Sequence, residues 1–446
     1  MKRTIILACA LLLTTLSYAQ DSTKTKAPSR KGWTCGVLPS IGFDADLGFQ
    51  LGALTNIYYF GDGSTYPEYL HSFYAEAAYT TRNYGLFRMS YDSKYLIPKH
   101  RLSIDLCYLP DAMCDFYGFN GYQSKFHPEY VDMDDSRYVS RAYYKMKRDI
   151  FRLTADLQGT IKGHWHWNSG LGLLYYNVGE VNRENLNRYI KNEDKKLPDT
   201  ASLYDKYIEW GLIDEAERNG GFHPYLHGGF TFDSRDRQQN PSKGIHADAF
   251  LTYNACFGKM KDYNNLKLNL TWRHYVSLLD TRIIFAYRVG AQFTLAGKTP
   301  FYVNTYMNQL YLQRVLYEGL GGANSTRGIM RNRVLANGFG YWNAEFRFKI
   351  VQYRIGKDYF YIGLNPFLDG GMVLQPYDLD GVKDIEGIEE DIDFDAPLYK
   401  PHLSAGCGLK IAMNDNFVLS VDWATALNKQ DNKKMSNFYI KMGYMF

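Results

Sequence analysis

The sequence predicts an all-β protein, a transmembrane antiparallel β-barrel of about 16 strands in a bacterial outer membrane. Three observations support this: an N-terminal export signal, repeated segments in which apolar and polar side chains alternate, and a distinctive composition. Aromatic residues make up 16% of the chain, with 39 Tyr, yet the mean hydropathy is only −0.38. After the signal, the sequence has no run of about 20 apolar residues, which a spanning helix needs.

The first 19 residues have the features of a secretory signal. A positive pair, Lys2-Arg3, precedes an apolar run and a small-x-small cleavage site that ends at Ala19. The stretch that follows is rich in Lys, Thr and Ser and is expected to be disordered. The predicted organisation is a signal peptide at 1–19, a short periplasmic tail at 20–33 and an outer-membrane barrel at 34–446.

Alternation of apolar and polar residues sets the orientation of the strands. In 342–350 the even residues are apolar, whereas the odd ones include Glu345 and Arg347. A shift of one residue would put charges into lipid, so Glu345 and Arg347 are expected to face the lumen. Sixteen strands are predicted, near 34–43, 47–60, 71–81, 84–96, 100–109, 142–160, 164–178, 222–233, 244–257, 265–278, 282–296, 338–352, 359–374, 399–413, 417–427 and 437–446.

The predicted connections fall into two classes. Short turns such as 97–100 and 279–281 follow even-numbered strands, and long loops follow many of the odd-numbered ones. Short turns on one side and long loops on the other are typical of the periplasmic and external ends of a barrel. The long loops are predicted at 110–141, 179–221, 297–337 and 375–398.

Two short segments suggest a charge pair inside the barrel. Asp369 lies on the inward face of its strand with Phe367 and Gly371, and the small Gly371 leaves space for a loop to approach. Arg327 carries a planar donor fork that suits a bidentate carboxylate contact. From the residues alone, a solvated loop arginine and an aspartate lining a wet pore remain an alternative. The loop motif is Arg327, Gly328 and Ile329, and the strand motif is Phe367, Asp369 and Gly371.

A third segment, 232–244, ends one strand and turns into the next. Pro241 pre-sets the turn and Gly244 supplies a flexible backbone before the next strand, so the charged residues are expected at the wet periplasmic rim. The turn motif is Asp233, Arg235, Asp236, Pro241 and Gly244.

In this order, with the strand that carries Glu345 and Arg347 between the loop and strand motifs, the three segments resemble the BamA/TamA surface-antigen family. The resemblance implies an outer-membrane barrel in which a loop arginine enters the lumen and pairs with a strand aspartate. It also implies assistance in the insertion or passage of proteins or lipids. Residues 20–33 are too few to form the periplasmic POTRA modules that assembly members of the family carry, so partner proteins are expected instead.

In that family, a seam between the first and last strands can part. The expected seam residues here are Gly36, Pro39, Gly42, Tyr444 and Phe446. Pro39 removes one donor from the strand ladder, which would weaken the seam, unless it lies near a strand end where no bond forms. The final strand is expected to end on an aromatic residue, because its even positions are apolar or aromatic and its odd positions include Lys441 and Gly443.

Several functional classes have little support in the sequence. The net charge of +4 is spread along the chain, so nucleic acid is not an expected partner. No metal site is predicted, because His164 and His166 have no third ligand nearby in the sequence. No cofactor and no enzymatic activity are predicted either.

Expected partners are outer-membrane lipids, periplasmic or surface proteins and barrel substrates. A passive channel or surface-structural barrel is the alternative, and a barrel enzyme is less favoured. The sequence leaves two alternatives for Cys107 and Cys114: a disulfide bridge or two separate thiols.

Overall fold

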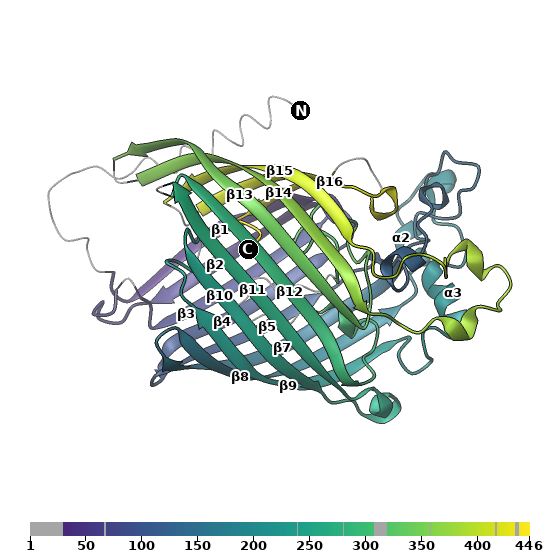
Figure 1. Cartoon of the computed structure of the whole chain (residues 1–446), viewed down its shortest axis with the longest axis horizontal. Coiled ribbons are helices and arrows are strands. Elements are labelled where there is room, and N and C mark those ends of the chain that lie inside the picture. The colour runs from purple at the N-terminus through teal and green to yellow at the C-terminus, as the bar shows by residue number, and fades with distance from the viewer. Residues whose placement is uncertain are drawn as a thin grey trace.

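The chain forms a closed antiparallel barrel with a packed cap at one end (Figure 1). The computed structural model describes residues 30–66, 68–238, 240–279, 281–306, 319–356, 358–414, 417–432 and 437–446. The predicted signal peptide at 1–19 lies outside the described residues, as does most of the tail at 20–33. No helix in the described part of the chain is long and apolar enough to cross a membrane.

Sixteen long strands make up the barrel in the described residues, and the sheet closes because β1 pairs with β17. This confirms the predicted fold class. The strands are β1 (Trp33–Asp44), β2 (Gly48–Tyr59), β3 (His71–Thr80), β4 (Gly85–Ile97), β5 (His100–Leu109), β7 (Lys145–Lys162), β8 (Trp165–Gly179), β9 (Gly220–Asp233), β10 (Gly244–Asn254), β11 (Asn265–Leu279), β12 (Ile283–Gly297), β13 (Gly338–Ile355), β14 (Asp358–Gln375), β15 (His402–Met413), β16 (Phe417–Ala426) and β17 (Asn437–Met442).

The remaining elements are short and lie in the connections. A two-residue strand, β6 (Cys114–Asp115), pairs with β7. The helices are α2 (Arg183–Asn187) and α3 (Leu203–Glu209), with 3₁₀ turns at Gly121–Gln123, Pro128–Tyr130, Glu193–Lys195, Gly258–Tyr263, Val303–Thr305, Asp380–Val382, Ile388–Glu390 and Lys429–Asp431.

Side-chain orientation follows the predicted alternation. On β13, Glu345 and Arg347 are each 1% exposed, whereas Phe346 between them is 41% exposed on the outer face. A barrel wall in lipid needs this order, because lipid cannot solvate charge and the lumen can supply polar partners.

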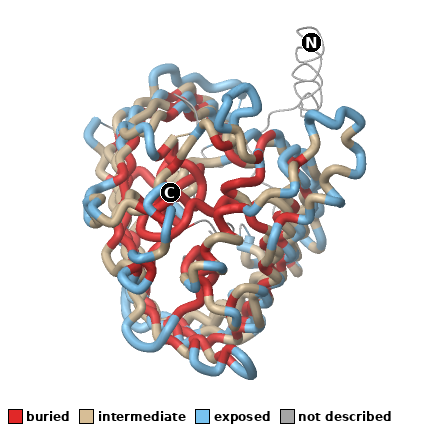
Figure 2. Tube along the Cα trace, turned by 90° about the vertical axis from the view of Figure 1, so that its right-hand side faces the viewer, coloured by how far each residue is buried: buried red, intermediate tan, exposed pale blue. Residues whose placement is uncertain are grey.

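The last strand is shorter than expected. It was predicted over 437–446 but ends at Met442, because Gly443 adopts a left-handed backbone with φ of +81°. The chain then turns inward, and the C-terminal end lies within the ring of strands when the barrel is viewed along its length (Figure 2). The prediction that the last strand runs to residue 446 was therefore wrong.

Long loops lie at one end of the barrel and short turns at the other (Figure 1). We refer to the packed loops 110–144, 180–219, 298–306 and 376–401 as the cap. Its centre is aromatic: the ring of Phe116 meets those of Tyr207 and Phe301 edge-on at 5.2 Å and 5.8 Å. When the molecule is viewed from the cap end, buried segments of the chain cross the ring of strands (Figure 2).

The described cysteines are free thiols. Cys107 is opposite Arg152 on β7, and Cys114 is opposite Met146. Six residues of one strand therefore separate the two positions, a distance of about 20 Å. This exceeds the reach of a disulfide, so the structure favours two separate thiols.

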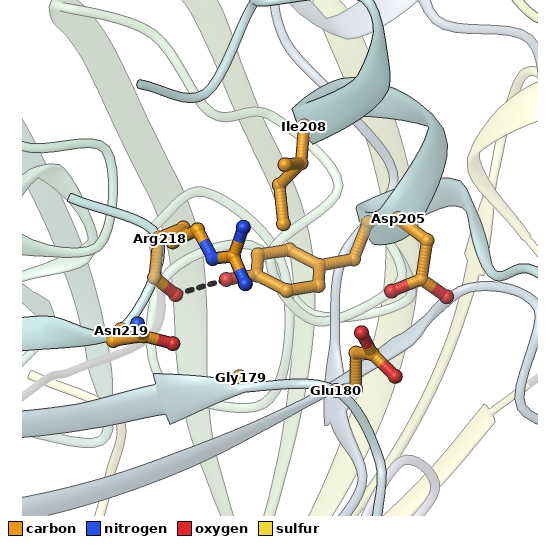
Figure 3. A pocket seen from close by; sticks show the side chains of 7 residues that line it. Gly179, Glu180, Asp205, Ile208, Arg218 and Asn219 are labelled. Carbon is orange, nitrogen blue, oxygen red and sulfur yellow. Dashed lines mark hydrogen bonds between the residues drawn. The ribbon is translucent and has the colours of Figure 1, made fainter. Parts of the chain in front are cut away.

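A pocket of about 200 Å³ opens at the base of the cap between the end of β8, α3 and the start of β9 (Figure 3). Across its floor, the Tyr204 hydroxyl donates to the carbonyl of Arg218. Asp205, on its wall, forms a capping box with Ser202 at the start of α3. These contacts give the lining residues a role in holding the cap together.

A buried carboxylate, Glu217, joins two parts of the cap. It accepts hydrogen bonds from the backbone N–H groups of Phe301, at 3.0 Å, and Asp214, at 3.4 Å. Asp214 in turn accepts from Lys298 and Tyr263. Burial raises the pKa of Glu217 from 4.5 to about 7, because the charged form loses its hydration.

The first prediction follows from this pKa. Because the folded cap holds an extra proton on Glu217 between pH 4.5 and about 7, the cap should lose stability as pH rises through this window, by up to about 3 kcal/mol. Glu217→Gln should flatten the pH dependence of limited proteolysis within 180–219. Glu215→Gln, at an exposed neighbouring carboxylate, is the control and should leave it unchanged. Equal profiles for wild type and Glu217→Gln would refute the assignment.

The second prediction concerns topology. On a background without cysteine, Tyr189→Cys in the cap and Asp384→Cys in the β14–β15 loop should react with impermeant thiol reagents on intact cells. Lys162→Cys, at the end of β7, and Thr281→Cys, in the short turn after β11, should not. Labelling of the turn positions from outside would reverse the orientation of the barrel.

Candidate functional site

The connection between β12 and β13 enters the lumen. We refer to its described part, 319–337, as the plug loop; nearly all of it is buried. Gly328 has φ of +87°, and a Cβ there would lie 2.9 Å from the backbone N of Thr425 on β16. Only glycine allows the loop to take this conformation so close to the wall. The neighbouring Ile329 is 1% exposed, and its carbonyl accepts from Gly322 N–H at 2.8 Å.

Arg327 lies at the centre of the plug loop and contacts Asp369 through three donors. Its Nε is 2.8 Å from Asp369 Oδ2, its Nη2 is 3.1 Å from Oδ1, and its backbone N is 3.1 Å from Oδ2. Both side chains are fully buried. The structure therefore brings together the two residues that the sequence suggested as a pair, in bidentate geometry.

The strand motif shapes the site for this arginine. The guanidinium carbon of Arg327 lies 3.4 Å from the centroid of the Phe367 ring, so the cation is stacked on an aromatic face. A Cβ on Gly371 would lie 2.7 Å from Leu320 Cδ1 of the plug loop. Glycine at 371 thus provides the space in which the loop approaches β14.

Arg327 belongs to a cluster of six buried charges. Its Nη2 is 3.2 Å from Glu345 and its Nη1 is 3.6 Å from Asp422. Arg347 pairs with Glu345 at 2.7 Å, and Lys410 pairs with Asp422 at 2.5 Å. Three cations therefore face three carboxylates, which offsets the cost of removing each charge from water.

Sequence reasoning missed part of this cluster. Asp422 and Lys410 lie on β16 and β15, and no local motif marks them. The signal that could have found them is parity, since both occupy inward positions of their strands. It also missed two further arginines of the plug loop. Arg331 is 2.8 Å from Asp111 and 3.1 Å from Asp115.

Arg333 completes the attachment of the plug loop to the cap. Its Nη1 and Nη2 donate to the carbonyls of Gly121 and Ser124, each at 2.9 Å, and its Nε is 3.4 Å from Asp431. Arginines 327, 331 and 333 thus connect the loop to the barrel wall and to the cap.

The turn motif lies at the other end of the barrel. Arg235 forms a bidentate pair with Asp233 at 2.8 Å and 2.9 Å, and Asp236 accepts from Ser242 N–H at 2.9 Å. Gly244 has φ of +104°.

The turn differs from the exposed rim that was expected. The Arg235 side chain is only 11% exposed. Pro241 is buried, and the adjacent Asn240 donates to the Tyr361 hydroxyl of β14 at 2.9 Å. The segment therefore bends toward the lumen at the short-turn end of the barrel, where Asn240 contacts β14.

The closing seam of the barrel is short. Within the described residues, β1 and β17 pair only at Phe43 with Ile440 and at Asp44 with Tyr439. β1 pairs with β2 along its whole length. Gly42 is next to the last pair, where a Cβ would lie 3.0 Å from the Ile440 carbonyl. Gly36 and Pro39 lie on the part of β1 that β17 does not cover.

Tyr444 and Phe446 are not at the seam. If β17 continued in the same register, Tyr444 would be opposite Pro39 and Phe446 opposite Val37. The turn at Gly443 instead takes both side chains toward Arg347, with Tyr444 at 4.0 Å and Phe446 at 5.5 Å. The pairing across the seam therefore ends at Ile440, and β17 itself ends at Met442.

In the described part of the chain, no three His, Cys, Asp or Glu side chains are grouped to hold a metal ion. His166, at the short-turn end of β8, interacts with Thr160 at 3.3 Å, and Trp165 is 51% exposed on the outer face. The lumen instead contains buried, paired charges around the plug loop. The wall contains one weakly paired junction, between β1 and β17.

The plug loop, the paired arginine and the short seam together define an outer-membrane barrel with a loop of its own chain in the lumen. Residues 117–446 match the model of the Omp85 superfamily domain. The chain belongs to the Omp85 superfamily, which confirms the resemblance seen in its motifs.

Solved structures agree with this assignment at the level of the fold. BamA from Haemophilus ducreyi, lacking POTRA domains 1–3, superposes with a TM-score of 0.53 at 14% identity, over 93% of this chain and 71% of that one. CdiB from Escherichia coli gives a TM-score of 0.52 at 9% identity, over 94% of this chain and 64% of that one. No curated protein matches the chain significantly.

The third prediction tests the charge pair. Arg327→Ala or Asp369→Ala leaves the six-charge cluster with one buried charge in excess, at a cost of up to about 3–5 kcal/mol. Barrel walls are stiff, so the loss should appear as a mobile plug loop, detected as new tryptic cleavage at Arg331 and Arg333. Arg188→Ala, at an exposed cap residue, is the control and should leave the loop protected.

The double variant should be no worse than either single one, because both remove the same contact. The charge swap Arg327→Asp with Asp369→Arg should restore protection only in part, since the fork geometry is reversed. Defects that simply add would show that the two residues act independently.

Proposed function

We propose that this barrel assists the insertion or translocation of proteins or lipids at the outer membrane, through the seam between β1 and β17 and together with partner proteins. The observation that supports this most directly is the contrast between the two possible routes. The lumen holds a plug loop that paired arginines attach to the wall and the cap, whereas the seam of the wall is joined at only two residue pairs within the described residues.

A free edge of β1 is chemically suited to this role. Along residues 33–42, every second residue directs its backbone N–H and C=O groups away from β2. Pro39 has no N–H to contribute. An extended segment of another chain can add to such an edge through main-chain hydrogen bonds, with little dependence on its sequence. Outward residues of β1, such as Val37 at 70% exposed, continue the edge into the apolar face that meets lipid.

A passive channel is the second candidate, but the plug loop argues against it. Ions would have to pass a region where Arg327, Glu345 and Asp369 are each at most 1% exposed. The partners of such a barrel are outer-membrane lipids, periplasmic or surface proteins and the client itself.

The fourth prediction tests the seam. Phe43→Cys with Ile440→Cys places two thiols on directly paired residues, so oxidation should lock the barrel closed. Locking should abolish the rescue of cells depleted of their own copy, measured as the content of assembled outer-membrane proteins, and reductant should restore it.

Leu409→Cys with Val421→Cys crosslinks an ordinary pair, β15 with β16, and is the control. Full activity of the locked seam, with the crosslink verified, would remove the seam from the mechanism.

A further inference from the structure

The hairpin of β13 and β14 projects beyond β12 at the short-turn end of the barrel (Figure 1). Pairing between β12 and β13 ends at Phe348, and the last main-chain contact there is from Lys349 N–H to the Arg282 carbonyl at 2.8 Å. β13 itself continues further. We refer to its residues 350–355 as the open edge. Among the described strands, none pairs with the open edge on the side away from β14.

The opposite side of the hairpin is firmly held. β14 pairs with β15 as far as Phe360 with Met413. Beyond that pair, Asn414 N–H donates to the Tyr359 carbonyl at 2.7 Å, and Asn414 Oδ1 accepts from Tyr359 N–H at 2.9 Å. Asn414 Nδ2 also donates to Asp358 at 2.7 Å. The open edge is therefore one side of a fixed sheet that lacks a neighbour on the other side.

A β-bulge gives the open edge an apolar outer face. The pairing with β14 shifts register between Lys349 and Val351, so the alternation of side chains changes by one residue. The Tyr353 ring then stacks on Phe360 of β14 with a centroid distance of 5.3 Å. Large apolar side chains are exposed along the edge: Ile350 at 62%, Val351 at 46%, Tyr353 at 44% and Ile355 at 64%.

Neither lipid nor water suits this edge. Alternate residues of an antiparallel strand direct their N–H and C=O groups away from β14, and in hydrocarbon each unpaired group costs several kcal/mol. Arg354, on the edge, and Arg282, at its base, are exposed and need water as well. In water, however, the four large apolar side chains stay uncovered. An added strand would satisfy the backbone and cover these side chains together.

The inner face of the open edge is cationic. Arg354 is opposite Tyr359, whose neighbour in the alternation, Tyr361, is buried on the lumen side. The Lys349 ammonium lies over the same two rings, 5.7 Å and 4.8 Å from their centroids. The carboxylate of the hairpin, Asp358, is already bound by Asn414. An added strand would therefore meet cations on its inner face and apolar groups on its outer face.

Two occupants from this chain fit the charge poorly. The segment 20–33 carries four cations, Lys24, Lys26, Arg30 and Lys31, against the single carboxylate of Asp21. A second copy would bring the cations of its own edge to the same interface. Like charges across a strand pair are destabilising, so a separate, acidic partner fits better.

We propose that the open edge binds a partner protein by strand addition. The partner contributes an extended segment in which acidic residues alternate with apolar ones: the acidic side chains face Arg354, and the apolar ones continue the outer face. Main-chain bonds supply affinity and the alternating side chains supply specificity. This deepens the proposed function, on which the partner's role rests, by identifying where a protein on the short-turn side, the predicted periplasm, is held against the barrel.

The experiment measures binding of a fluorescent peptide of alternating Glu and Val to the full-length barrel in nanodiscs of zwitterionic lipid, by anisotropy. The peptide should bind saturably. A peptide of alternating Lys and Val should not bind, because its charge matches that of the edge. A Glu/Val peptide with all amides N-methylated should not bind either, because it cannot donate main-chain hydrogen bonds.

Arg354→Glu should weaken binding of the Glu/Val peptide by about five-fold, as expected for a change at one exposed charge. Lys99→Glu makes the same change of charge in the exposed turn between β4 and β5, at the same end of the barrel, and should leave the affinity unchanged. Heat-modifiable migration on gels verifies that each variant is a folded barrel. Binding of the N-methylated peptide, or an affinity insensitive to Arg354→Glu, would overturn the proposal.

Two further outcomes would assign the open edge to this chain itself. Deletion of residues 20–31 should leave the peptide affinity unchanged, and an increase would identify that segment as the occupant. The wild-type barrel should be monomeric at the concentrations used, and a dimer that the peptide dissociates would identify a second copy. Either result would overturn the proposal of a separate partner.

The oxidised seam variant, Phe43→Cys with Ile440→Cys, separates this proposal from the proposed function. The open edge is on β13, four strands from β17, so peptide binding should survive the lock. If binding follows the predicted pattern but the locked barrel remains active, strand addition stands and the seam mechanism fails. If locking abolishes activity while the binding pattern is absent, strand addition alone fails.

Discussion

A guanidinium without access to water requires nearby negative charge, and the lumen of this barrel is arranged around that requirement at Arg327. Asp369, Glu345 and Asp422 project from three different strands toward it, and Arg347 and Lys410 balance the excess. The net stability of such a buried cluster is modest, because desolvation offsets most of the Coulomb attraction. Its contribution is positional: any other placement of the plug loop leaves charges unpaired.

The same arrangement divides the wall into a rigid part and a weak part. β13 to β16 carry the cluster on their inner face, and each pairs with its neighbours along most of its length. β1 and β17 share only two residue pairs in the described chain, because the chain turns inward at Gly443. Its last two aromatic residues, Tyr444 and Phe446, then contact Arg347 instead of extending the seam. One charge network thus holds the plug, through Arg327, and the C-terminal end, through Arg347, so that plug position and seam length are physically connected.

Strand positions and facing were predictable from the sequence because lipid outside and polar groups inside impose a strict period of two, as in 342–350. The Arg327–Asp369 contact was reached through motifs and inward parity. Asp422 and Lys410 were not, since cross-strand neighbours leave no mark in local sequence. The end of β17 was also missed: alternation continues through Phe446, and only Gly443, which permits a left-handed turn, signalled that the strand stops. Contacts within the cap depend on long-range packing of loops and had no local pattern.

Single-channel conductance in planar bilayers tests the central claim most directly, namely that the plug loop closes the lumen. The intact barrel should show small or erratic conductance, and deletion of residues 319–334 should convert it into a large, steady pore, because the charge cluster then lines water instead of protein. A large, steady, ion-selective conductance from the intact barrel, unchanged by the deletion, would contradict the account and identify the protein as a passive channel.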